Sequence, residues 1–181
     1  MEKAIVMKGI FKLFDGVSRA INKCLLVPGL RNSFSSCGKN VTLGRRFEVA
    51  GAENISMGHD VYLGPGATLL TTRARIEVGD YVMIGPNLTV ITGDHRMDVL
   101  DRPMMALDDS EKLPENDQDV IIGNDVWLGS NVTVLKGVHV ADHCVVAAGA
   151  VLTKDVQPEY SVWGGVPARM LTMRPGADAH E

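Results

Sequence analysis

Residues 119–153 repeat an aliphatic side chain at every sixth position, and no other feature of the chain restricts its possible folds as much. A helix would repeat its apolar residues about every 3.6 positions, and an isolated amphipathic strand would alternate apolar and polar residues. A six-residue period with Gly, Asn and Asp between the apolar pairs instead predicts a parallel β-helix, in which three hexapeptides form one triangular coil. The expected interior residues are Ile122, Leu128, Val134, Val140, Val146 and Leu152, with a second inward set two positions earlier at Val120, Val126, Val132, Val138, Cys144 and Ala150.

The same period extends the predicted β-helix back to about residue 41, with two interruptions. Residues 71–75 break the count and are expected to form a bulge or small loop. Residues 91–119 lack periodicity and are rich in Asp, Glu and Pro, so they are expected to leave one corner of the prism as a long loop. Loops of this length inside a compact domain are often functional. The earlier interior residues are Leu43, Val49, Met57, Leu63, Leu69, Val78, Ile84 and Val90.

The N-terminal residues 4–26 are predicted to form an amphipathic helix that ends at Pro28-Gly29. The preferred role for this helix is to cap the end of the prism, because the last coil of a solenoid must be covered. The alternative is that its basic face contacts anionic lipid or a membrane-bound partner. The predicted organisation is therefore an N-terminal helix and lead-in (1–40), a β-helix (41–157) with a catalytic loop (93–119), and a C-terminal extension (158–181) that leaves the prism after Leu152.

Composition and charge exclude several classes of protein. The 181 residues carry a formal net charge of -4, which gives no electrostatic footprint for nucleic acid. Three cysteines without metal-ligand spacing favour a reducing compartment, and no apolar run approaches the roughly 18 residues that span a bilayer. A cytoplasmic protein is therefore expected. Four of the five histidines, His59, His95, His139 and His143, are not spaced to bind one metal ion, so no metal site is predicted.

Four residues near or within the repeat are candidates for chemistry or ligand binding. His95 lies at the start of the long loop, where a rigid scaffold would hold a side chain that can accept and return a proton near neutral pH. A solvated surface histidine is the alternative. Trp127 lies between the inward residues Val126 and Leu128, so its ring is expected to point outward, as a wall for a ligand or as a subunit contact. Lys154 and Arg169, after the repeat, are candidates for phosphate contacts or solvated side chains.

Four segments in a fixed order resemble the hexapeptide-repeat acetyltransferases, namely TGDHR, IGNDVWLGSNVTVLKGV, AAGAVLTKDV and GGVPARML. Within that family the chain is most similar to the maltose, galactoside and xenobiotic acetyltransferases and the sugar O-acetyltransferases of polysaccharide pathways. The resemblance implies a left-handed parallel β-helix and a homotrimer with active sites between subunits. It also implies acetyl-CoA as co-substrate and no required metal.

The resemblance assigns roles residue by residue. His95 corresponds to the general base, and the backbone N–H of Ser130 to the group that meets the oxyanion. The positions that correspond to coenzyme A contacts are Trp127, Ala148, Thr153, Lys154 and Arg169. A further basic position of the galactoside enzymes is Thr172 here.

The acceptor side differs from the galactoside enzymes. Their sugar-binding asparagine and aspartate are replaced by Pro65 or Gly66 and by Arg73. Arg73 and Arg75 suggest the hypothesis of an acceptor that carries phosphate, diphosphate or carboxylate. The candidate acceptor contacts are Arg73, Asp94 and Asp98, and Asp94 is also a candidate for holding the loop or orienting His95.

The implied function is O-acetylation, with acetyl transfer from acetyl-CoA to a hydroxyl of a sugar or polysaccharide precursor and His95 as the base. Two alternatives stay open at this point. One is a non-enzymatic trimeric β-helix that serves as an interaction module, although such a module would not require His95 or Trp127. The other is an N-acetyltransferase of an amino sugar, because the same base and co-substrate serve an amine.

Overall fold

The computed structural model describes residues 2–177 of the chain. The chain divides into two compact units, Met1–Ser33 and Phe34–Glu181. The first unit contains α1 (Glu2–Ile21), a π-helical turn (η1, Asn22–Leu26) and α2 (Val27–Ser33). No helix among the described residues is long and apolar enough to cross a membrane.

The predicted end of the N-terminal helix at Pro28-Gly29 is wrong, because the chain stays helical to Ser33. Proline lacks an N–H and crowds the carbonyl four residues before it, which normally breaks a helix. Here a π-helical turn precedes Pro28, and the N–H of Val27 donates to the carbonyl of Asn22, five residues back. Pro28 therefore falls in the first turn of α2, where its missing N–H is tolerated.

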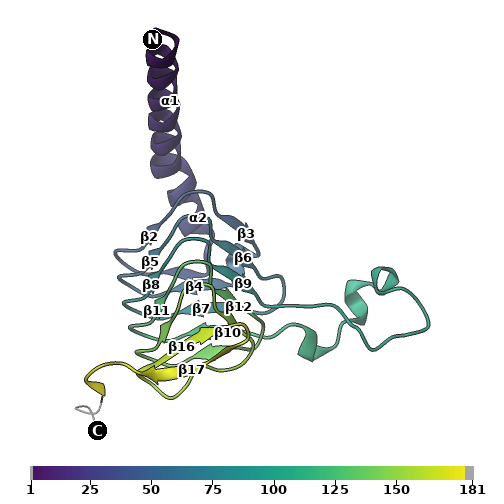
Figure 1. The fold of residues 1–181 in the computed structure, drawn as a ribbon. Helices are drawn as coiled ribbons and strands as arrows, with labels where there is room; N and C mark the ends of the chain where they lie inside the picture. Colours follow the sequence, from purple (N-terminus) through teal and green to yellow (C-terminus); the bar gives the residue numbers. More distant parts are fainter. Residues whose placement is uncertain (1, 178–181) are drawn as a thin grey trace. The chain divides into compact units, whose positions relative to one another are not determined.

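The second unit is a parallel β-helix built from three sheets, which form the three sides of a prism (Figure 1). Sheet A contains β1 (Ser36–Cys37), β4 (Ile55–Met57), β7 (Ile76–Val78), β10 (Val120–Ile122) and β13 (His139–Val140). Sheet B contains β2 (Thr42–Leu43), β5 (Tyr62–Leu63), β8 (Met83–Ile84), β11 (Trp127–Leu128), β14 (Val145–Val146), β16 (Ser161–Gly165) and β17 (Ala168–Met173). Sheet C contains β3 (Glu48–Ala50), β6 (Thr68–Leu70), β9 (Thr89–Ile91), β12 (Thr133–Val134) and β15 (Val151–Leu152).

The interior of the prism is filled by the predicted columns. In sheet B, Ile84, Leu128 and Val146 are register partners in adjacent parallel strands, and all three are buried. All twelve inward residues predicted between 119 and 153 are buried, and Cys144 is among them as a small interior side chain. The predicted parallel β-helix of hexapeptide repeats, with an N-terminal helix and a long loop excursion, is confirmed.

The corners of the prism contain the residues with left-handed backbone, as expected for Asn and Asp. Asn87 and Asn131 have φ values of 60° and 57°, and their side chains are joined by a hydrogen bond of 3.0 Å. Tyr81 and His143 adopt the same conformation at equivalent corners, although tyrosine does not favour it. The stacking of the coils thus imposes this geometry on whichever residue occupies the position.

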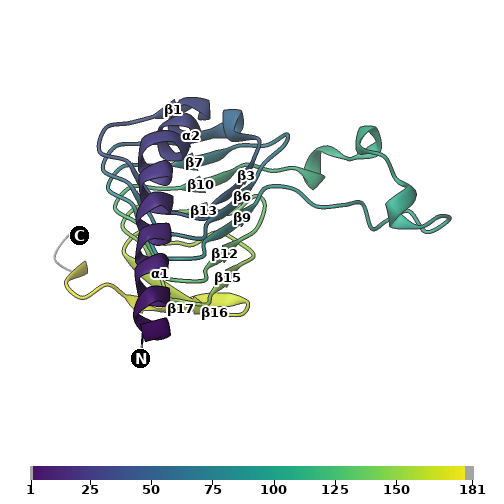
Figure 2. The same ribbon diagram turned by 90° about the horizontal axis from the view of Figure 1, so that it is seen from above.

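The two interruptions of the repeat lie at the same edge of the prism, between sheets C and A. Residues 71–75 turn this corner in one coil, and residues 92–119 leave it in the next. The long loop contains three short 3-10 turns, η3 (Met104–Ala106), η4 (Asp109–Glu111) and η5 (Pro114–Asn116). Figure 2 shows the loop projecting away from the stacked strands.

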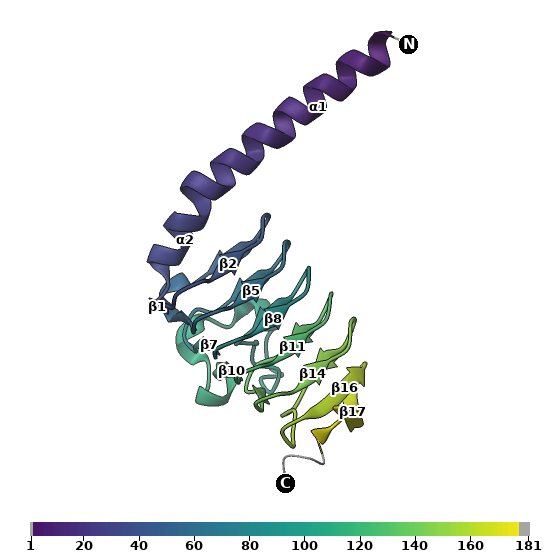
Figure 3. The ribbon, with the colours of Figure 1, turned by 90° about the vertical axis from the view of Figure 1, so that its left-hand side faces the viewer.

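The chain continues the prism after Leu152, although the sequence predicted that it would leave there. Val156 forms a parallel bridge with Val140 of sheet A, β16 pairs in parallel with β14, and β17 returns antiparallel to β16. Val156, Trp163 and Ala168 are buried over the last full coil. The apolar end of the stack therefore gains a cover from residues that do not follow the six-residue period, and sheet B extends without a gap (Figure 3).

Candidate functional site

His95 lies where the long loop begins. Sheet C ends with β9 at Ile91, Thr92 is buried, and Gly93 forms an antiparallel bridge with Asp117 on the returning leg of the loop. The side chain of His95 is exposed, and no hydrogen bond to it occurs within residues 2–177. Its ring nitrogens are therefore open to a substrate.

The two legs of the loop are joined by backbone hydrogen bonds at Thr92 and Asp94, immediately before His95. The N–H of Asp94 donates to the carbonyl of Asn116 at 2.8 Å, and the N–H of Gln118 donates to the carbonyl of Thr92 at 2.8 Å. The buried side chain of Asn116 adds a bond from its Nδ2 to Oδ1 of Asp94 at 2.8 Å. The exposed histidine therefore stands on a hydrogen-bonded base.

Asp94, predicted as an acceptor contact or a loop anchor, uses both carboxylate oxygens within the chain. Oδ1 accepts the bond from Asn116, and Oδ2 lies 2.8 Å from Nζ of Lys136. Burial raises the pKa of Asp94, but the hydrogen bonds from Lys136 and Asn116 outweigh it, so the pKa lies below its ordinary value. Asp94 is thus a carboxylate that holds the base of the loop at neutral pH.

The other two predicted acceptor contacts also have partners in the chain. Arg73 donates through Nη2 to the carbonyl of Asp109 in the loop, and its Nη1 lies 3.9 Å from Asp117. Asp98 accepts two hydrogen bonds from Arg96, at 2.9 and 2.6 Å. Arg75, considered with Arg73, pairs with Asp119 and Glu77. Any of these side chains would have to exchange a partner to bind an acceptor.

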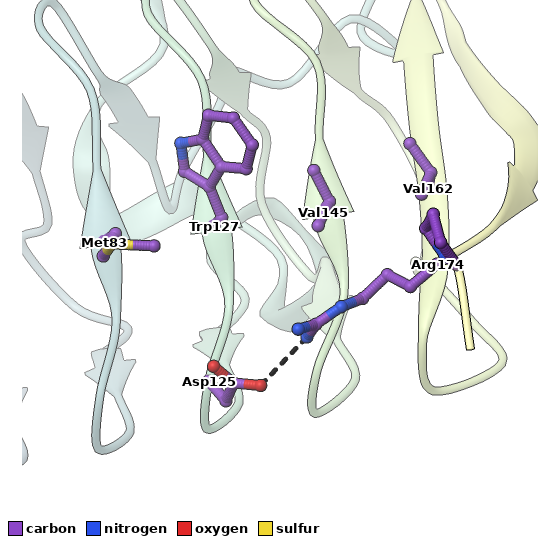
Figure 4. A pocket seen from close by; sticks show the side chains of 7 residues that line it. Met83, Asp125, Trp127, Val145, Val162 and Arg174 are labelled. Atoms are coloured by element: carbon purple, nitrogen blue, oxygen red, sulfur yellow. Dashed lines mark hydrogen bonds and ion pairs between the residues drawn. The ribbon is translucent and has the colours of Figure 1, made fainter. Parts of the chain in front are cut away.

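Trp127 forms part of a pocket of about 360 Å³ on the outer face of sheet B. Its ring points outward, as predicted, and is 52% exposed. Met83, Trp127, Val145 and Val162 are successive register partners in β8, β11, β14 and β16, so they form one outward row along the stack (Figure 4). The pocket thus has an apolar floor that runs parallel to the prism axis.

Arg174 closes the polar side of this pocket, and no motif or spacing in the sequence predicted it as a site residue. Its Nη1 lies 2.9 Å from Oδ2 of Asp125 and also donates to the carbonyl of His143 at 2.9 Å (Figure 4). Nδ1 of His143 lies 3.0 Å from the same carboxylate oxygen. The hydrogen bond with His143, and then that with Arg174, lower the pKa of Asp125 against the opposing effect of burial. These contacts fasten the end of the chain beside Trp127.

The corner between sheets B and C presents two backbone donors without partners. Ser130 and Ala148 occupy the middle of this corner in successive coils, and neither N–H donates a hydrogen bond within the described chain. Pro65 and Pro86 occupy the equivalent position in the two preceding coils, where no N–H exists. The coils that contain Trp127 and Val145 therefore present free backbone N–H groups at this edge, whereas the two preceding coils do not.

The remaining predicted coenzyme contacts are exposed. Thr153 and Lys154 follow β15 at the edge between sheets C and A, and Arg169 lies on β17, with Nη1 donating to the carbonyl of Ala168 at 2.8 Å. Among the described residues, no group of three or more His, Cys, Asp and Glu side chains is arranged to hold a metal ion.

The structure does not bring all the predicted site residues together within one chain. His95 lies at the edge between sheets C and A, because the loop connects β9 of sheet C to β10 of sheet A. Trp127 lies on sheet B, which is the side of the prism opposite that edge. Ser130 and Ala148 lie at the edge between sheets B and C, next to Trp127 rather than to His95.

The fold and the site together define a class of protein, namely β-helices of hexapeptide repeats that carry an exposed histidine at the start of a long loop. The family model described as bacterial transferase hexapeptide (six repeats) matches residues 119–154. A probable macrolide acetyltransferase from Lysinibacillus sphaericus is 45% identical over 56 residues, which make up 31% of each chain. The match thus spans about a third of the length of this curated relative.

Two solved structures are similar over most of the chain. The hexapeptide-repeat containing acetyltransferase from Vibrio cholerae O1 biovar eltor, complexed with acetyl coenzyme A, is 28% identical, with a TM-score of 0.72 and coverage of 88% of this chain and 84% of that chain. A maltose O-acetyltransferase from Clostridium difficile 630 is 26% identical, with a TM-score of 0.70 and coverage of 90% and 85%. The predicted resemblance to the hexapeptide-repeat acetyltransferases and the predicted left-handed parallel β-helix are confirmed.

Proposed function

We propose that the protein transfers an acetyl group from acetyl-CoA to a hydroxyl of a sugar or polysaccharide precursor, with His95 as general base. The observation that carries this proposal is the exposed imidazole on a hydrogen-bonded loop base, without a hydrogen-bond partner among residues 2–177, in a chain similar to acetyltransferases. A non-enzymatic interaction module would have no use for that arrangement.

The outer surface of the prism fits the chemistry of coenzyme A. The pantetheine arm alternates short apolar segments with amides, and the pocket beside Trp127 offers an apolar floor next to the N–H groups of Ser130 and Ala148. Lys154 and Arg169 are exposed cations that suit phosphate groups. Acetyl-CoA supplies the activated acetyl thioester as a co-substrate.

The proposed reaction is a direct transfer. His95 takes the proton of the acceptor hydroxyl as its oxygen forms a bond to the thioester carbonyl carbon. The N–H of Ser130 stabilises the negative charge that develops on the carbonyl oxygen. The carbon–sulfur bond then breaks, and the proton on His95 passes to the departing thiolate. Positioned general-base catalysis of this kind contributes about 10² to 10⁴-fold.

The proposed active form is a homotrimer with each site shared by two subunits. The position of His95 at the edge opposite the side that bears Trp127 supports this proposal. A second copy is needed to place the imidazole of one chain against the groove of another. Mixing His95→Ala with Trp127→Ala protein, after reversible dissociation of both, should restore activity, because hybrid interfaces contain both wild-type residues. Inactive mixtures that form hybrid trimers would contradict a shared site.

The acceptor is tested by a screen coupled to detection of free thiol, since each turnover releases one CoA. Neutral sugars, anionic sugars and sugar nucleotides are compared at fixed acetyl-CoA, and the acetylated product is analysed by mass spectrometry and alkaline hydrolysis. We expect an alkali-labile ester on a sugar hydroxyl. A product with an alkali-stable amide would instead assign N-acetylation.

A further inference from the structure

We propose that Lys136 is a positioning residue for His95, acting as a clamp that joins the two legs of the loop from the neighbouring coil. This inference rests on the proposed role of His95 as general base. Lys136 lies at the corner after β12, one coil further along the prism than the loop, and at the same edge between sheets C and A.

The ammonium group of Lys136 contacts both legs of the loop. Nζ lies 2.8 Å from Oδ2 of Asp94 on the outgoing leg, and it donates to the carbonyl of Glu115 on the returning leg at 2.5 Å. Asn116 holds the other oxygen of Asp94 at 2.8 Å. The carboxylate next to His95 is therefore held from two directions, once by the loop itself and once by the scaffold.

The other basic residues at this edge contact different parts of the loop. Arg73, from the preceding coil, reaches Asp109 and Asp117, and Lys112 lies 3.5 Å from Asp117 and 3.8 Å from Asp109. In the part of the chain that the structure describes, Lys136 is the basic side chain that pairs with the residue adjacent to His95. Its effect on the orientation of the base is thus more direct than that of Arg73 or Lys112.

The clamp is expected to affect the position of the base more than the stability of the fold. The side chains of Lys136 and Asp94 are 25% and 39% exposed, and ion pairs at such positions contribute little to global stability. A displacement of a catalytic group by about 1 Å, by contrast, can lower a rate by about 10²-fold. Loss of the Lys136 clamp is therefore expected to lower the reaction rate more than the free energy of unfolding.

The test compares Lys136→Met, which keeps the length of the side chain, with Lys136→Arg and with Lys39→Met. Lys39 is an exposed lysine at a corner between sheets A and B, away from the loop. We expect Lys136→Met to lower kcat by about 10 to 100-fold and to leave the KM for acetyl-CoA within about two-fold. Lys136→Arg should recover most of the rate, and Lys39→Met should match wild type.

Hydrogen exchange provides a readout that does not depend on catalysis. In Lys136→Met, the amides of Asp94 and Gln118, which bridge the two legs, should exchange at least about tenfold faster than in wild type, with interior amides of β12 unchanged. Unchanged exchange at the loop base, or an unchanged kcat while His95→Ala is inactive, would overturn the clamp. If His95→Ala is fully active, the proposed function fails, and the exchange result alone decides whether Lys136 holds the loop.

Discussion

Replacing Trp127 with alanine should weaken coenzyme A binding by roughly 10 to 50-fold. The ring is 52% exposed in the free chain, so about half of a tryptophan surface, roughly 100 Å², is available to cover a ligand. At about 25 cal/mol per Å² this area corresponds to about 2.5 kcal/mol, or up to about 60-fold in affinity. Met83, Val145 and Val162 remain as an apolar floor, so the loss is expected to fall somewhat below that limit.

Isothermal titration of CoA into the purified protein measures this change without any acceptor. Tyr62→Ala is the matched control, because Tyr62 is 48% exposed in the same outward row of sheet B, two strands before Trp127, but does not line the pocket. Tyr62→Ala should bind CoA as wild type does. A loss below about two-fold for Trp127→Ala, or an equal loss for both variants, would refute the assignment of the groove.

Three further outcomes follow from the structure. Leu128→Ala empties a fully buried position between Ile84 and Val146 and should cost about 2–5 kcal/mol in chemical denaturation, whereas the outward Ile121→Ala should cost about 1 kcal/mol or less. Because the pKa of Asp125 is lowered, its carboxylate stabilises the fold above the ordinary aspartate pKa of about 3.9, and this stabilisation is lost as the pH falls through the lowered pKa. The difference in unfolding free energy between wild type and Asp125→Asn should therefore shrink between pH 6 and pH 3. A constant difference would argue against the ion pair. Arg73→Ala should reduce rates with neutral and anionic acceptors in equal proportion, because the guanidinium holds the loop; a loss confined to anionic acceptors would restore its predicted role as an acceptor contact.

The six-residue period was sufficient to predict the prism because every coil places the same positions inward. Leu128 and Val146 lie in the expected column, and the long loop leaves the expected corner. The six-residue period does not predict the path of segments that do not follow it. Val156 and Trp163 therefore continue the stack where the sequence predicted an exit, and their burial depends on the apolar end that the last coil leaves open.

Individual residues of the candidate site could be predicted from the sequence, but the contacts between them could not. His95 and Trp127 were selected from their places relative to the repeat. The ring of Trp127 points outward as predicted, and His95 is exposed, while its role as a base stays a prediction. The partners of Asp94 and Arg73 come from neighbouring coils, and such lateral contacts leave no periodic signal in one sequence. The alignment of corners places residues 73, 94, 136 and 154 at one edge, since all four follow a strand of sheet C, but it does not identify which of them pair.

The contact between Arg174 and Asp125 is another one that the sequence does not predict. It follows the last strand and contacts Asp125, which lies 49 residues earlier, at a corner of sheet B. No motif connects the two, and only the antiparallel return of β17 brings the arginine to the pocket. Contacts that depend on the path of an aperiodic segment require the structure.

The role of His95 is tested most directly by comparing His95→Ala with wild type in CoA release from acetyl-CoA, using an acceptor from the screen. Circular dichroism and the oligomeric state of both proteins establish that the variant is folded. We predict the same fold and assembly with a rate at least about 10²-fold lower, because the hydroxyl would have no base to take its proton. A folded His95→Ala protein with wild-type activity would contradict the proposed mechanism.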